Sequence, residues 1–320
     1  MRIGSSLIAL AGLALAIYLV GKEGFNAVFQ ALNVAGWTGL GAITLFHALP
    51  TVLCGIAWWL LVRLHSSESW PLFSWVRWLR DGIDGVLPVV PVSGDMVGVR
   101  ILALRGLRLA GASVIVDMTA ELLSQTIFAV IGFALLFAIH PDSPYLLWIA
   151  IGILAMGVQF VGFLVAQRKG LFRFVERLWR RRKKEPQEID DRTLHDHIIT
   201  LYNDPWDFFG CIFIHLIAWI VGAFEAWLGL WFMGQPLDIG RVLAIESLIY
   251  ALRSVTFFVP LGAGVQEGGY VLIGGLFGLG PDLALAISLL KRARDLIIGL
   301  PAILVWHHIE RRNMARNPAS

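Results

Sequence analysis

Charged side chains in the middle of the last apolar stretch could bind a polar group inside a membrane. Residues 291–295 read KRARD and begin about 14 Å into that stretch if it is helical, at a rise of 1.5 Å per residue. A charge at the centre of a bilayer costs at least about 2.5–3.5 kcal/mol, so it normally faces a partner or a polar cavity. Asp295 can neutralise Lys291 or Arg292, which lie four and three residues before it. The positive charges that remain, Arg294 among them, predict a carboxylate on another segment or an anionic head group.

Acidic side chains in two other apolar stretches are candidates for the same site. Asp117, Glu121 and Gln125 recur every four residues and therefore lie along one stripe of a helix. In an apolar helix this stripe must face inward. Glu246 and Arg253 also share a helix face, but they are two turns apart, too far for a direct contact. We expect each of them to meet another helix.

A glycine-rich run before the last stretch is predicted to break a helix within the membrane. Residues 259–269 read VPLGAGVQEGG, with breaks expected at Pro260, Gly262 and Gly264 and a carboxylate at Glu267. Unpaired backbone groups in hydrocarbon cost several kcal/mol each, so non-helical chain survives there only inside protein or along a wet cavity. We therefore expect a re-entrant segment that lines the site, with Glu267 as a partner for the positive charges.

A segment with a similar sequence occurs earlier in the chain. Residues 89–95 (VVPVSGD) follow the same order of residue types as residues 258–264 (FVPLGAG). The first run is entered from an arginine-rich side and the second from a charge-poor side, which is what an inverted repeat of a transporter requires. This similar segment adds further candidates to the site, namely Pro91, Gly94, Asp95 and Arg100.

The composition predicts a membrane protein. Of the 320 residues, 57% are hydrophobic and only 15% are charged, whereas a soluble domain carries about 25% charge. The apolar windows can each cross about 30 Å of hydrocarbon; they are residues 3–20, 37–62, 112–139, 144–166, 206–233, 238–259 and 282–306. We expect an all-α polytopic protein, a single transmembrane domain over residues 1–320, with about seven spanning helices and two re-entrant or broken segments in an inverted repeat. No soluble catalytic domain and no nucleic-acid partner are expected.

The distribution of lysine and arginine predicts the topology. Residues 167–204 contain ten of them, whereas the connections 140–143 and 234–237 contain none. Because short basic loops stay in the cytoplasm, the basic loop and the C-terminus are expected there. Two basic amphipathic stretches, 72–79 and 171–178, are typical of helices on the membrane surface that favour anionic lipids; the alternative is that they only add to the topology signal.

Neither a metal nor a cofactor is predicted. Cys54 and Cys211 each lie in an apolar window, and His195 and His197 have no further ligands at metal-binding spacing. The sequence also lacks the phosphate-cradling G-x-x-x-x-G-K-[ST] motif, which argues against direct ATP drive.

The chain resembles the flippase-like membrane domain found at the N-terminus of lysylphosphatidylglycerol synthases and as stand-alone bacterial and archaeal proteins. The residues that carry the resemblance are Pro260, Gly262, Gly264, Glu267, Gly278, Ala284, Ala286, Arg292 and Arg294, with residues 91–95 and Arg100 as a second feature. Residues 289–295 and 117–125 are similar to the branch associated with hopanoid biosynthesis. The resemblance implies a bacterial inner-membrane protein that moves a hopanoid or hopanoid-bearing lipid.

We therefore expect a non-enzymatic lipid translocase in which Arg292 and Arg294 hold an anionic or polyol head and the carboxylates balance their charge or carry protons. One alternative is a membrane-embedded enzyme that modifies lipid head groups, using pairs such as Asp81 with Asp84, or His65 with Asp95. Another is a scaffold that recruits lipid-synthesis enzymes through the basic loop. Glycines at 274, 275, 278 and 280 would permit close helix packing, either within one chain or in a homodimer.

Overall fold

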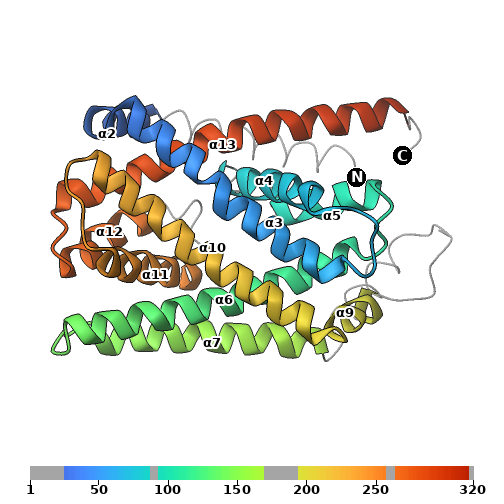
Figure 1. Cartoon of the computed structure of the whole chain (residues 1–320), viewed down its shortest axis with the longest axis horizontal. Helices are drawn as coiled ribbons and strands as arrows, with labels where there is room; N and C mark the ends of the chain where they lie inside the picture. Colours follow the sequence, from blue (N-terminus) through green and yellow to red (C-terminus); the bar gives the residue numbers. More distant parts are fainter. Residues whose placement is uncertain (1–24, 87–92, 169–193, 257–263, 317–320) are drawn as a thin grey trace, which may run out of the picture.

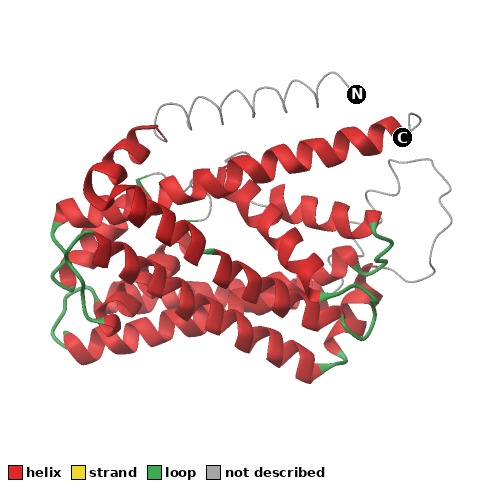
Figure 2. Ribbon diagram, turned by 45° about the horizontal axis from the view of Figure 1, so that its top comes forward, coloured by secondary structure: helices red, strands yellow, loops and turns green. Residues whose placement is uncertain are grey.

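The described part of the protein, a computed structural model, is a bundle of helices that run mainly along one axis (Figures 1 and 2). It comprises residues 25–86, 93–168, 194–256 and 264–316, and no strand occurs among them. The first helices are α2 (Phe25–Phe46), α3 (Ala48–Val62), α4 (Trp70–Val86), α5 (Ser93–Leu104), α6 (Ala110–Ile139) and α7 (Leu146–Arg168). Those that follow are α9 (Leu194–Tyr202), α10 (Pro205–Phe232), α11 (Ile239–Val255), α12 (Val265–Leu276) and α13 (Pro281–Arg316). The prediction of an all-α protein is confirmed.

Four helical segments are long and apolar enough to cross a membrane, and they are Asn33–Val62, Ala110–Ile139, Leu146–Gln167 and Pro205–Phe232. They agree with four of the predicted windows. α7 lies on the outside of the bundle, where Leu147, Trp148 and Leu154 are 67–70% exposed. An outward surface of this kind suits lipid rather than water. The predicted window 3–20 lies outside the described residues.

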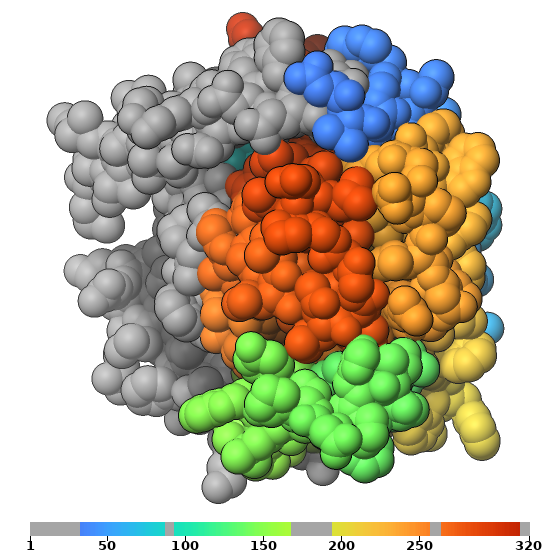
Figure 3. Space-filling model, turned by 90° about the vertical axis from the view of Figure 1, so that its left-hand side faces the viewer, coloured from blue at the N-terminus to red at the C-terminus, as the bar shows by residue number. Residues whose placement is uncertain are grey.

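The connections between helices divide by charge. Those after α6, α10 and α12, which lie together at the end of the bundle seen in Figure 3, contain no lysine or arginine. The connections after α3 and α5 contain Arg63, Arg105 and Arg108 and lie at the opposite end, together with α9 and the end of α13 (Figure 1). This division follows the pattern from which the topology was predicted.

Interior packing places α4 inside the bundle. Phe73, Val76 and Leu79 are fully buried, and the helix packs against α3 and α13. At the crossing with α13, a Cβ added to Gly299 would collide with the carbonyl oxygen of Gly82, so the two backbones need glycine to approach this closely. The interpretation of residues 72–79 as a membrane-surface helix is therefore wrong. The second such stretch, 171–178, lies outside the described residues.

Two segments of the chain have matching architecture. α4 and α11 are each 17 residues long, and α5 and α12 are each 12 residues long. Each short helix ends in a tight turn at a glycine with positive φ, +84° at Gly106 and +85° at Gly278, before a long helix, α6 or α13, begins. α4 packs against α13, and α11 packs against α6. A 12-residue helix is about 18 Å long, too short to cross the bilayer alone. Pro91, Pro260 and Gly262 lie outside the described residues.

Candidate functional site

A cavity of about 290 Å³ lies inside the bundle between α3, α4, α6, α10, α11 and α13. Its charged lining residues are Arg77, Asp81, Asp84, Glu121, Glu225, Arg253, Arg294 and Asp295. Three arginines thus face five carboxylates, which gives a formal net charge of −2 when His47 is counted as neutral. Charged groups at this density inside an apolar bundle need partners. All of them except Asp84 and Arg253 belong to one of two ion-pair clusters.

The first cluster joins α4 to α6. Arg77 Nη2 lies 2.6 Å from Glu121 Oε1, and Arg77 Nε donates to Asp81 Oδ2 at 2.7 Å. Arg80 Nη1 donates to Asp117 Oδ2 at 2.6 Å, and its Nε lies 2.5 Å from Asp95 Oδ1 on α5. The contacts with Glu121, Asp81 and Asp117 are charge-assisted hydrogen bonds, which are stronger than neutral ones, and the contact with Asp95 is an ion pair. The two guanidinium groups therefore bind three helices together at one point.

His215 on α10 completes the first cluster. Its Nε2 lies 2.9 Å from Asp117 Oδ1, and both side chains are fully buried. Asp117, His215 and Cys211 offer three possible metal ligands within 4.8 Å of one another. However, both oxygens of Asp117 are already engaged, one by Arg80 and the other by His215. Two guanidinium groups at the same carboxylate also repel a cation, so this cluster is an ion-pair network and not a metal centre.

The second cluster joins α13 to α10 and α2. Arg294 Nη1 donates to both carboxylate oxygens of Glu225, at 2.7 and 2.6 Å, and Nη2 lies 2.9 Å from Asp295 Oδ1. His47, between α2 and α3, lies 2.7 Å from Glu225 through Nδ1 and also contacts Arg294. Glu225 and Arg294 are buried, whereas the Asp295 side chain is 32% exposed. The charge of Arg294 is therefore balanced within the protein.

Neighbouring charges on α13 are paired with the following helices. Lys291 Nζ lies 2.5 Å from Glu246 Oε2 on α11, and Tyr270 on α12 donates its hydroxyl to the same carboxylate. Arg292 Nη2 donates to Glu267 Oε1 at 2.5 Å, and Glu267 accepts a further bond of 2.8 Å from the N–H of Gly264. α13 is thus tied to α11 and α12 by separate ion pairs.

Comparison with models of protein families shows which family the chain belongs to. A family model described as "Lysylphosphatidylglycerol synthase TM region" matches residues 3–302, nearly the whole sequence. The chain belongs to this family. No curated protein and no solved structure matches it. Membership of the lysylphosphatidylglycerol synthase transmembrane family fits a membrane protein with a lipid-related function, in agreement with the long apolar helices.

In this member of the family, four of the predicted site residues line the cavity, and they are Glu121, Arg253, Arg294 and Asp295. Five others lie in the ion-pair networks beside it, and they are Asp95, Asp117, Glu246, Glu267 and Lys291. Arg292 pairs with Glu267, one of the carboxylates expected to balance the positive charges of the last apolar stretch. The expected pairing of Asp295 with Lys291 or Arg292 is wrong, because Asp295 pairs with Arg294.

Two predicted residues lie apart from the charged cavity. Arg100 Nη2 lies 3.4 Å from Glu310 on α13, and its side chain is half exposed. Gln125 accepts a hydrogen bond of 2.7 Å from Ser254 and joins α6 to α11.

Gly94 lies near the start of α5, where its N–H donates to Asp84 of α4 at 2.7 Å.

The sequence analysis missed the arginines of α4 and the histidines at positions 47 and 215. A signal for the arginines was present. Arg77, Arg80 and Asp81 have the spacing of Lys291, Arg294 and Asp295, a basic residue followed three residues later by Arg-Asp. α4 and α13, the two helices that carry this pattern, pack against each other. The lone histidines carried no comparable pattern.

Proposed function

We propose that this protein is a non-enzymatic translocase that moves a polar-headed lipid across the bacterial inner membrane, with its C-terminus in the cytoplasm. The observation that carries the proposal is the charged cavity inside the bundle. Family membership and the lipid-facing surface of α7 support a lipid as the substrate. A hopanoid, as the resemblance to that branch implies, is the first candidate, and a phospholipid is the second.

The position of the two clusters suits transport. Asp117 lies seven residues after the start of α6, and Glu225 lies seven residues before the end of α10. At 1.5 Å per residue, each is about 10 Å from its end of the bundle, and the two ends are opposite ones (Figure 1). A head group that moved between the clusters would therefore cover the middle of the membrane.

The cavity's size and chemistry favour a head group over a whole lipid. Pockets that enclose a drug-sized ligand are about 300–1,000 Å³, so about 290 Å³ accommodates a head while the apolar body stays in the bilayer. Inside hydrocarbon the head loses its water, and polar groups there cost free energy unless they are hydrogen-bonded. Carboxylates that accept from hydroxyl or amino groups, and guanidinium groups that donate to oxygens, would replace that water and lower the barrier.

Arg253 is the cavity residue best suited to contact the head group. Arg77 and Arg294 are both held by carboxylates, whereas Arg253 is exposed and makes no ion pair with any described residue. This refines the expectation that Arg292 and Arg294 hold the head, because the charge of each is already balanced. The hydroxyl groups of a polyol head would accept hydrogen bonds from Arg253 and donate hydrogen bonds to the surplus carboxylates.

The proposal includes an inverted repeat of α4–α5–α6 and α11–α12–α13. Matching helix lengths, the glycine turns at Gly106 and Gly278, and the crosswise packing of α4 with α13 and of α11 with α6 support it. In transporters, movement of one such repeat against the other opens a midplane site to either side in turn.

The test is transbilayer movement of labelled lipids in vesicles that contain the purified full-length protein. A labelled hopanoid and a labelled phospholipid are compared, with the native chain and two variants of α11. Arg253→Gln should slow movement at least tenfold, whereas Arg241→Gln, an exposed arginine in the first turn of the same helix, should leave it unchanged. Absence of movement with every lipid, or equal rates for both variants, would contradict the proposal.

A further inference from the structure

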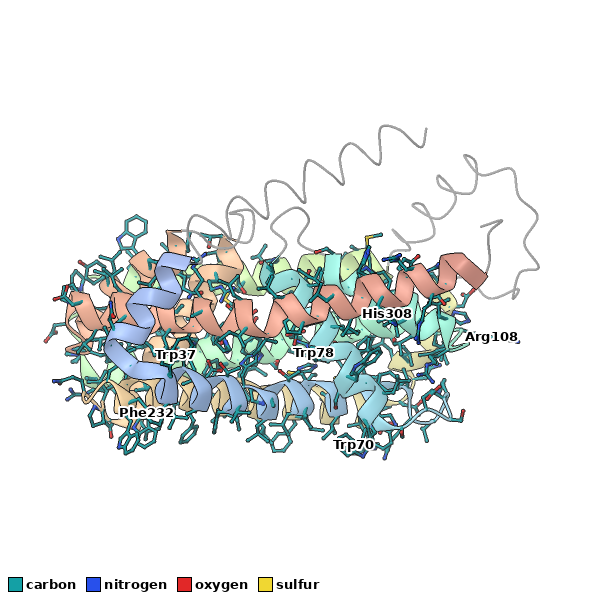
Figure 4. The ribbon with its side chains drawn as sticks, turned by 90° about the horizontal axis from the view of Figure 1, so that it is seen from above. Trp37, Trp70, Trp78, Arg108, Phe232 and His308 are labelled. Carbon is teal, nitrogen blue, oxygen red and sulfur yellow. The ribbon has the colours of Figure 1, made fainter. Side chains whose placement is uncertain are left out.

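A second polar cavity lies at the arginine-bearing end of the bundle and shares no lining residue with the first. It measures about 580 Å³, is open on one side, and is lined by the α3–α4 connection, the α5–α6 turn and α9. Its polar lining includes His65, Ser67, Arg105, Arg108, His197 and Thr200. Figure 4 labels Arg108 and Trp70 at this end of the molecule, well away from Trp37 and Phe232.

The charge of this outer cavity is opposite to that of the inner one. Among its described lining residues, two arginines, Arg105 and Arg108, and one carboxylate, Glu68, give a formal net charge of +1 with the histidines neutral. The inner cavity carries −2 by the same count. An anion is therefore attracted to the outer cavity and repelled by the inner one.

The local backbone holds these groups in place. The α5–α6 turn is fixed by Gly106, which has a φ of +84°, and by the N–H of Leu107, which donates to Leu102 at 3.0 Å. On the facing connection, Ser66 accepts a hydrogen bond of 3.1 Å from the N–H of Glu68. The Glu68 carbonyl in turn accepts one of 3.1 Å from the indole of Trp59 on α3. Hydrogen bonds within the protein thus hold two of the three segments that line the cavity.

Two further features favour an oxyanion. The cavity is lined by Leu107 and Leu109, directly before α6, so the positive end of a 30-residue helix faces it. Arg105 is exposed and makes no ion pair with a described residue. Guanidinium groups, imidazoles and hydroxyls together are the donors that bind phosphate oxygens.

The position of the cavity along the spanning helices gives its level in the membrane. Two candidate membrane spans meet it, one ending at Val62 and the other beginning at Ala110. A cavity at the ends of spanning helices lies at the level of lipid head groups. We propose that the outer cavity is a phosphate-binding site at the membrane surface. The phosphate group can belong to an anionic lipid head or to a soluble molecule.

The test uses the full-length protein in two settings. In lipid discs of phosphatidylcholine alone, binding of inorganic phosphate is measured by calorimetry. In discs that also contain phosphatidylglycerol, the retained lipid is counted by native mass spectrometry after transfer to detergent. Arg105→Gln and, separately, His65→Gln are compared with the control Arg241→Gln at the opposite end of the bundle.

Loss of one charge-assisted contact should weaken binding about tenfold in the Arg105→Gln variant, with a smaller loss for His65→Gln and none for the control. Binding of phosphate alone identifies a soluble ligand, and retention of phosphatidylglycerol identifies a lipid head. The proposal is overturned if neither probe binds the native protein, or if Arg105→Gln binds both probes as the native protein does. It is also overturned if Arg241→Gln weakens binding equally, since net charge alone would then explain the effect.

Discussion

Glu225 on α10 accepts hydrogen bonds at 2.6 and 2.7 Å from one nitrogen of Arg294 on α13, and both side chains are buried. Each helix thereby supplies a buried partner for the charge of the other, in addition to Asp295 for Arg294 and His47 for Glu225. Such a pair adds little net stability when intact, but it is costly to break, because the remaining charge keeps its desolvation penalty.

Substitution of one partner should therefore destabilise the protein more than substitution of both. We expect Glu225→Gln to lower the free energy of unfolding by about 3–5 kcal/mol, with His47 and Asp295 compensating in part. The double variant Glu225→Gln/Arg294→Gln should recover a substantial part of that loss. Denaturation in detergent, followed by tryptophan fluorescence, measures both, and additive losses in the double variant would contradict the pairing.

The first cluster predicts a contrast between two aspartates that bind arginines of α4. Asp117 is fully buried and meets Arg77, Arg80 and His215, whereas the Asp81 side chain is 32% exposed and its one ion pair with a described residue is that with Arg77. Asp117→Asn should cost about 3 kcal/mol or more, and Asp81→Asn less than about 1 kcal/mol. The same unfolding measurement compares the two variants. Equal losses would mean that burial does not decide the strength of this cluster.

The sequence was sufficient to predict that the charges within apolar stretches find partners on other helices. It offered a lipid phosphate, Glu267 or Glu121 as partners for the positive charges of α13. The structure pairs Glu267 with Arg292 at 2.5 Å, whereas Glu121 pairs with arginines of α4. It could not assign the remaining pairs. Asp295 is within reach of Lys291 along the helix, but Lys291 binds Glu246, which is buried and also holds Tyr270. Helical spacing shows which residues can meet, and only tertiary packing decides which do.

The same limit explains the error in α4. Its apolar residues recur at helical spacing, and its other face carries arginines, as in a helix on a membrane surface. In the structure the arginine face meets Asp117 and Glu121 in place of water or lipid head groups. A polar helix face has the same sequence pattern in both situations. The repeated basic-x-x-Arg-Asp spacing of α4 and α13 was the one feature that could have distinguished them.

Close packing of α4 on α13 gives a prediction that involves no charge. Gly299→Ala should destabilise the bundle by about 1–3 kcal/mol, because the added methyl group meets the carbonyl oxygen of Gly82 and the side chain of Val86. Gly157→Ala is the matched control on α7, where a Cβ would have nothing within 4 Å.

Thermal unfolding of the two variants in the same detergent makes the comparison. The Gly157→Ala protein should unfold at the native temperature or slightly above it, since alanine favours the helix. If Gly299→Ala behaves in the same way, the backbones of α4 and α13 do not approach as closely as the structure indicates.

The division of charged connections between the two ends of the bundle predicts which end faces the cytoplasm. Ser143 lies in the charge-poor α6–α7 connection, and Ser67 lies in the α3–α4 connection beside the arginines of the outer cavity. Because basic connections are retained in the cytoplasm, Ser143→Cys should react with a membrane-impermeant thiol reagent added to intact cells. Ser67→Cys should react only after the inner membrane is permeabilised.

The native thiols should give little background labelling, because Cys211 is buried and Cys54 is half-buried within an apolar helix. Labelling of the native chain measures this background directly. Labelling in the reverse pattern would invert the topology and place the outer cavity on the external face, so its phosphate would then have to come from the outer leaflet or the periplasm.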